Sequence, residues 1–169
     1  KFFDEKLFEK IANYCYRSNK NIRFILVGYG QKLIYLEELN LPNVKCFGER
    51  SQEDLGKIIP AMDLGLVVAP VNQSTRKAFA VKIFEYIGSG IPVLITANEA
   101  AQEIVERYGF GRSLNPEVWQ EGIDWLIACA RDKSLLKPYR CAVFRQREQF
   151  SRTKQARVFC DLLENVGFF

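Results

Sequence analysis

The chain has 169 residues and a formal net charge of +4, and 48% of its side chains are hydrophobic and 26% charged. These values are typical of one globular domain with a hydrophobic core, and they exclude a disordered or fibrous chain. The sequence contains no histidine, which excludes a histidine base within this chain and disfavours a conventional zinc site.

The five cysteines indicate a reducing, intracellular environment, because none of them forms a C-x-x-C pair and several lie in apolar runs. No window approaches eighteen uninterrupted apolar residues, and the start shows no signal-peptide pattern. We therefore expect a cytoplasmic protein. The chain begins at Lys1 rather than Met, so we also expect it to be a piece of a longer protein.

Apolar runs typical of buried strands alternate with helical periodicities along the whole chain. Strands are predicted at 22–28, 43–48, 64–70, 91–96 and 112–114. Helices are predicted at 4–18, 31–39, 51–61, 81–88, 99–108, 116–130, 134–150 and 152–165. This alternation predicts repeated βαβ units, and therefore a single α/β domain over 1–169 with a Rossmann-like, doubly wound parallel sheet.

In such a sheet, ligands bind beyond the carboxyl ends of the strands, which here directs attention to the loops at 28–31, 47–52, 69–80 and 96–99. The first of these loops contains Gly28 and Gly30, which permit a tight turn and a close approach of the backbone to a ligand. It is not a dinucleotide fingerprint, because Leu33 stands where the third glycine would be.

The segment AFAVKIFEYIGSGIPVLIT, residues 78–96, carries the most information about chemistry. Lys82 and Glu85 share one face at the start of its predicted helix, where exposed backbone N–H groups favour a phosphate. Glu85 lies among apolar neighbours, so we expect it to be half-buried and to need polar partners such as the two hydroxyls of a ribose. The alternative is a simple surface ion pair between Lys82 and Glu85.

Three strings in order, IRFILVGYG, NVKCFGERSQEDLGKIIPAMDLGLVVAP and FAVKIFEYIGSGIPVLIT, resemble a known family. They are similar to the C-terminal, nucleotide-sugar-binding domain of retaining GT-B glycosyltransferases of the glycosyl transferases group 1 type. The resemblance runs from about residue 4 to residue 114, and its most specific part is K-x-x-E-Y-x-x-x-G-x-P-V, from Lys82 to Val93.

The resemblance implies a role for each residue that matches the donor-nucleotide site of the family. Glu85 corresponds to a glutamate that holds the ribose hydroxyls, and Lys82 lies near the diphosphate. The backbone amides at the helix start approach the same phosphates, and the loop after the second strand flanks the base. These two groups are Phe79, Ala80 and Val81 for the phosphates, and Gly48, Glu49 and Arg50 for the base.

Two departures from the family pattern affect the expected activity. Lys77 stands where the family has a second glutamate that contacts the donor sugar. We expect one of three roles for Arg76 and Lys77: they favour an anionic donor sugar, they neutralise phosphate, or they are solvated charges of the loop. The strand that normally precedes the helix at 4–18 is absent, so we expect either a gap in the sheet or other residues filling its place, between the strands at 22–27 and 91–95. We also expect the acceptor domain to lie outside this chain, which therefore holds no catalytic residue and is inactive alone.

The leading prediction is a glycosyltransferase that transfers a hexose from a nucleotide-diphosphate sugar to a glycan or lipid-linked acceptor, as in polysaccharide biosynthesis, without a metal or other cofactor. The alternatives are half of a nucleotide-sugar epimerase and a degenerate, non-catalytic interaction module.

Residues 1–130 carry a net charge of −1 and residues 131–169 a net charge of +5. This basic tail is either an ordinary solvated helix face or a contact with the inner face of a membrane, and nucleic acid is not an expected partner.

Overall fold

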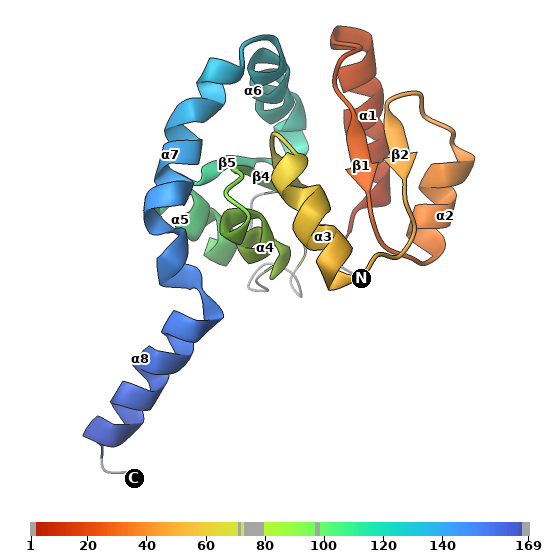
Figure 1. The fold of residues 1–169 in the computed structure, drawn as a ribbon. Helices are drawn as coiled ribbons and strands as arrows, with labels where there is room; N and C mark the ends of the chain where they lie inside the picture. The colour runs from red at the N-terminus through yellow and green to blue at the C-terminus, as the bar shows by residue number, and fades with distance from the viewer. Residues whose placement is uncertain (1–2, 71, 73–79, 97–98, 167–169) are drawn as a thin grey trace.

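The computed structural model describes residues 3–70, 72, 80–96 and 99–166 (Figure 1). Short strands form two parallel sheets: β1 (Phe24–Leu26) pairs with β2 (Val44–Cys46), and β4 (Val93–Thr96) lies between β3 (Gly65–Val67) and β5 (Gly111–Leu114). The strands expected at 22–28, 43–48 and 64–70 are present, but each is only three residues long. The Rossmann-like α/β class is confirmed.

Every strand is followed by a helix, as the alternating sequence pattern predicts. The α-helices are α1 (Glu5–Ser18), α2 (Gln31–Glu38), α3 (Gln52–Ile58), α4 (Lys82–Gly88), α5 (Glu99–Arg107), α6 (Trp119–Arg131), α7 (Lys137–Gln146) and α8 (Arg152–Asn165). Short 3-10 helices lie at Ile59–Ala61, Pro116–Val118, Lys133–Leu136 and Arg147–Phe150.

Side-chain caps explain where two of these helices begin. The carboxylate of Asp4 accepts a hydrogen bond of 2.9 Å from the N–H of Leu7, which stabilises the first turn of α1. The hydroxyl of Ser51 accepts one of 3.1 Å from the N–H of Asp54 at the start of α3. The second cap lies where the helix expected at 51–61 begins.

The two sheets have no strand in common, and this break corrects the place expected for a gap or for residues that fill it. Strand β4 is hydrogen-bonded on one side to β3 and on the other to β5, so no further strand fits beside it. The break therefore lies between the β1–β2 pair and an outer strand of the other sheet, not next to the strand expected at 91–96. The spacing of strands along a sequence does not determine their order in space, which explains the error.

Two hydrophobic clusters lie on opposite faces of β4, with Leu94 in one and Val93 and Ile95 in the other. The first contains α1, α2 and α6 side chains together with Phe24 of β1 and Leu94 of β4, so it extends across both sheets. The second lies against β4 and contains Ile83 and Ile87 of α4 with Val105 of α5. Helices α1 and α4 are therefore held by burial of apolar side chains, each contributing about 1.5–3 kcal/mol when fully buried.

The C-terminal helices divide into a packed part and an extended part. Phe150 lies in an aromatic cluster, with ring centroids 5.7 Å from Phe84, 5.1 Å from Tyr108 and 5.4 Å from Phe110. Helix α8 buries no residue and extends away from the sheets in Figure 1, leaving apolar side chains such as Phe159 and Leu162 exposed. No helix within the described ranges is long and apolar enough to span a membrane.

Glycine is required at position 111 because the backbones of β4 and β5 approach closely there. A Cβ atom at Gly111 would lie 1.7 Å from the carbonyl oxygen of Val93. We expect Gly111→Ala to lower the free energy of unfolding by about 3 kcal/mol in urea titrations. Gly56→Ala is the matched control, since a Cβ in helix α3 meets no atom within 4 Å, and it should stabilise by about 0.5–1 kcal/mol. Equal stability of the two variants would show that this approach is not a constraint.

All five cysteines are free, and burial separates Cys15 and Cys129 from the exposed Cys141 and Cys160. Desolvation raises the pKa of the Cys15 thiol from 9.0 to about 12. The stabilisation that Cys15 provides is therefore present below pH 9 and lost as the pH rises towards about 12, because only the unfolded chain then ionises readily. We expect iodoacetamide at pH 8 to alkylate Cys141 and Cys160 but not Cys15, as read by mass spectrometry, and all five in urea. Rapid alkylation of native Cys15 would contradict its burial.

Candidate functional site

The loops that follow β1 and β2 lie side by side at the carboxyl edge of the first sheet (Figure 1). The N–H of Gly28 donates a hydrogen bond of 2.9 Å to the carbonyl oxygen of Gly48. Gly28, Gly30 and Gly48 adopt φ values of 148°, 110° and 63°, which other residues rarely adopt. A Cβ at any of the three would meet no atom within 4 Å. These glycines therefore serve the turn itself, and the surface beside them is open.

The carboxyl ends of β3 and β4 are joined by one buried hydroxyl. Thr96 is only 3% exposed, and its hydroxyl both accepts from the N–H of Ala69 and donates to the carbonyl oxygen of Ala69, at 2.9 Å in each case. Because both polar groups are buried and satisfied, this pair holds the two strand ends at a constant separation. The sequence did not single out Thr96, since its partner lies 27 residues away.

Helix α4 is positioned by its apolar face. Ile83 and Ile87 are fully buried against β4, and the ring of Tyr86 lies over β3, where a Cβ on Gly65 would come within 2.4 Å of it. Burial also raises the pKa of the Tyr86 phenol. The first turn closes through hydrogen bonds of 3.0 Å from Ile83 N–H to the Ala80 carbonyl and from Phe84 N–H to the Val81 carbonyl.

The same helix presents the Lys82–Glu85 pair on its other face. Their charged atoms, Nζ and Oε2, are 3.8 Å apart, and the side chains are 68% and 39% exposed. The expected half-burial of Glu85 is confirmed. At this length and exposure the pair contributes little to stability, so the fold does not depend on the Glu85 carboxylate being bound to Lys82.

The loop expected to flank a base is described from Phe47 to Arg50. The Arg50 guanidinium donates a hydrogen bond of 2.9 Å to the carbonyl oxygen of Glu49 and lies 5.9 Å from the centre of the Phe47 ring. Glu49 and Arg50 are both exposed. The predicted site residues that the structure describes thus form two groups: Gly48–Arg50 after β2 of the first sheet, and Ala80–Glu85 at the start of α4, which packs against the second sheet.

Three further predicted residues, Arg76, Lys77 and Phe79, lie outside the described residues. The departure at Lys77 and its effect on a donor sugar therefore stay a prediction. No group of three or more potential metal ligands occurs in the part of the chain that the structure describes.

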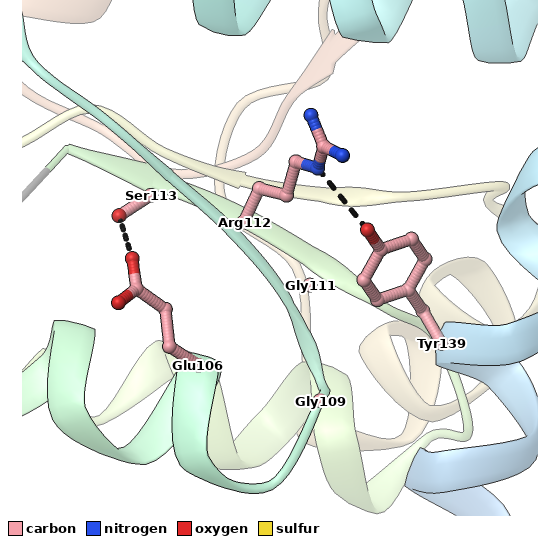
Figure 2. Close-up of a pocket in the computed structure, with 6 residues that line it drawn as sticks. All are labelled: Glu106, Gly109, Gly111, Arg112, Ser113 and Tyr139. Carbon is pink, nitrogen blue, oxygen red and sulfur yellow. Dashed lines mark hydrogen bonds between the residues drawn. The ribbon is translucent and has the colours of Figure 1, made fainter.

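A separate hollow of about 440 Å³ lies along the outer edge of β5 (Figure 2). Arg112 Nε donates to the Tyr139 hydroxyl at 3.1 Å, its guanidinium lies 5.3 Å from the centre of the Trp125 ring, and Ser113 donates to Glu106. Sequence reasoning assigned no role to these residues, because α7 brings Tyr139 to β5 only in the folded chain. The hollow lies beside β5, at the edge of the second sheet opposite β3. The predicted site residues instead follow β2 and β3 along the chain.

The fold is similar to that of solved GT-B glycosyltransferases. WaaG, a glycosyltransferase involved in lipopolysaccharide biosynthesis, is 20% identical with a TM-score of 0.67, over 86% of this chain and 38% of WaaG. The pneumococcal O-GlcNAc transferase GtfA, solved with UDP and GlcNAc, is 15% identical with a TM-score of 0.70, over 95% of this chain and 32% of GtfA. A chain of the GtfA/B complex is 14% identical with a TM-score of 0.72, over 95% of this chain and 33% of that one.

These similarities show the fold, and the chain spans less than two fifths of the length of each of these structures. No curated protein sequence matches the chain. The family model for "Glycosyl transferases group 1" matches residues 2–132, which include the loops after β1 and β2, strand β3 and all of α4. The chain therefore belongs to the group 1 glycosyl transferase family.

Proposed function

We propose that this chain forms the donor-nucleotide site of a glycosyltransferase that uses a nucleotide-diphosphate sugar. The observation that carries the proposal is the position of Glu85. Its carboxylate projects from a helix whose opposite face is fully buried, its one ion-pair partner in the described ranges is a distant and exposed lysine, and the family model covers it. A carboxylate that is held in place but weakly paired can accept hydrogen bonds from two vicinal hydroxyls.

In this proposal Glu85 holds the ribose and Lys82 lies beside the diphosphate with the backbone amides of Ala80 and Val81. The loop Gly48–Arg50 flanks the base. The sheets support this arrangement because both groups of residues follow strands at their carboxyl ends, which is where open α/β sheets bind ligands. The reaction we propose is transfer of a hexose to a glycan or lipid-linked acceptor, with the acceptor site in another domain.

Association with a membrane surface is a further part of the proposal, and the basic C-terminal region supports it only in part. Lys133 and Arg140 both pair with Asp63, at 2.9 and 3.3 Å. These two basic side chains therefore attach the C-terminal region to the loop before β3 and are not free to contact a membrane. The basic residues of α8, Arg152, Lys154 and Arg157, stay exposed and are the ones that would face an anionic lipid surface.

The proposal predicts that Glu85→Ala weakens binding of nucleoside diphosphates without loss of stability. We expect the affinity of the preferred one of UDP, GDP and ADP to fall at least tenfold, since two hydrogen bonds to a charged acceptor are lost. Ligand-observed NMR suits this test, because it detects weak binding. The melting temperature should stay unchanged, as the Lys82–Glu85 pair is long and exposed.

Glu103→Ala provides the matched control for this measurement. Glu103 forms a similar exposed pair with Arg107, 3.7 Å apart on helix α5, so its loss changes the net charge equally. This variant should bind nucleotides as the wild type does. Equal affinities of the Glu85→Ala and wild-type chains would contradict the ribose role.

A further inference from the structure

The side chain of Tyr29 is the most exposed large hydrophobic side chain described, with 82% of its surface accessible. It makes no hydrogen bond, ring contact or ion pair within the described part of the chain, so the fold does not need an aromatic residue at this position. Single exposed hydrophobic residues are common on protein surfaces. The surroundings of Tyr29 distinguish it from such residues.

Two glycines present Tyr29 at the carboxyl edge of the first sheet. Gly28 and Gly30 both adopt positive φ values, and the space beside each of them is open to at least 4 Å. Strand β1 ends two residues before Gly28 and helix α2 begins directly after Gly30, so the tyrosine is anchored on both sides by regular structure. The ring therefore stands on a short, defined turn with free space around it.

The turn that carries Tyr29 is bonded to the loop proposed to flank the base. The hydrogen bond from Gly28 N–H to the Gly48 carbonyl joins the two loops one residue away from Tyr29 and one residue away from Glu49. In the second loop Arg50 lies near the Phe47 ring and remains exposed. An aromatic face and a guanidinium consequently occur on adjacent loops at the edge where a ligand would lie.

We propose that Tyr29 is the surface on which the base of the donor nucleotide stacks. The inference rests on the proposed function, and it adds a base-contacting residue that the resemblance does not supply. Every nucleobase has an aromatic face, and stacking on a protein side chain commonly accounts for about tenfold or more in affinity. Tyr29 would thus contribute to affinity for the base end of the donor, while Glu85 contributes to the ribose.

The test compares Tyr29→Phe, Tyr29→Leu and Tyr29→Ala in this 169-residue chain. We expect Tyr29→Phe to bind the preferred nucleoside diphosphate as the wild type does, and the Leu and Ala variants to bind it about tenfold more weakly. Binding of inorganic pyrophosphate, which has no base, should be the same in all four proteins. The upfield ring-current shift of the base protons should appear with Tyr and Phe and vanish with Leu and Ala.

Tyr16→Ala is the matched control, since Tyr16 lies in the last turns of α1, at the other end of that helix from the carboxyl edge. It should leave nucleotide binding unchanged. If Tyr29→Ala binds nucleotides normally while Glu85→Ala does not, the stacking role is wrong and the proposed function stands. If Tyr29→Ala weakens pyrophosphate and nucleotide equally, the base is not what Tyr29 contacts. If the wild-type chain binds no nucleotide, both proposals are overturned.

Discussion

The arrangement of the whole molecule depends on the burial of one face of α1. The strands of the two described sheets share no backbone hydrogen bond, so other elements that pack on both sheets must hold them together. Phe8 and Ile11 of α1 are almost completely buried, and the Phe8 ring meets Phe24 of β1 edge-on with centroids 5.3 Å apart. At its start, the N–H of Asp4 donates to the carbonyl of Val68, just beyond β3, at 2.9 Å. Helix α1 thus contacts both sheets.

This bridge is what gives the proposed site its geometry. The base-flanking loop belongs to the first sheet, whereas helix α4 packs on the second. The position of one relative to the other therefore depends on how α1 packs against both sheets. Helix α6 adds a second support, because Tyr14 of α1 donates to Asp124 at 2.7 Å and packs on Trp119. The polar residues proposed to bind the donor are half-buried or exposed, and Lys82 and Glu85 are only weakly paired. Stability therefore comes mainly from the apolar core, while the carboxyl edge is free to bind a ligand.

Much of this fold follows from local sequence patterns. Apolar runs predicted β1, β3 and β4, and β2 and β5 lie at the shorter strands expected at 43–48 and 112–114. The spacing of Lys82 and Glu85 predicted their shared face on α4. Long-range pairing was not predictable in the same way. The sequence does not show that β4 has neighbours on both sides, that Thr96 bonds to Ala69, or that Tyr139 reaches Arg112. Each of these depends on strand order or helix packing, which spacing along one chain does not encode.

The central claim is that the carboxyl edges of the two sheets together bind a nucleoside diphosphate. The most direct test is to titrate ¹⁵N-labelled protein with UDP, GDP and ADP and to map the shifts of the backbone amides. The account predicts that one of the three nucleotides shifts the amides of Gly28–Gly30, Gly48–Arg50 and Ala80–Glu85 together. It is contradicted if the shifts gather instead at the hollow beside β5, around Gly111–Ser113 and Tyr139, or if none of the three nucleotides shifts any amide at the carboxyl edge.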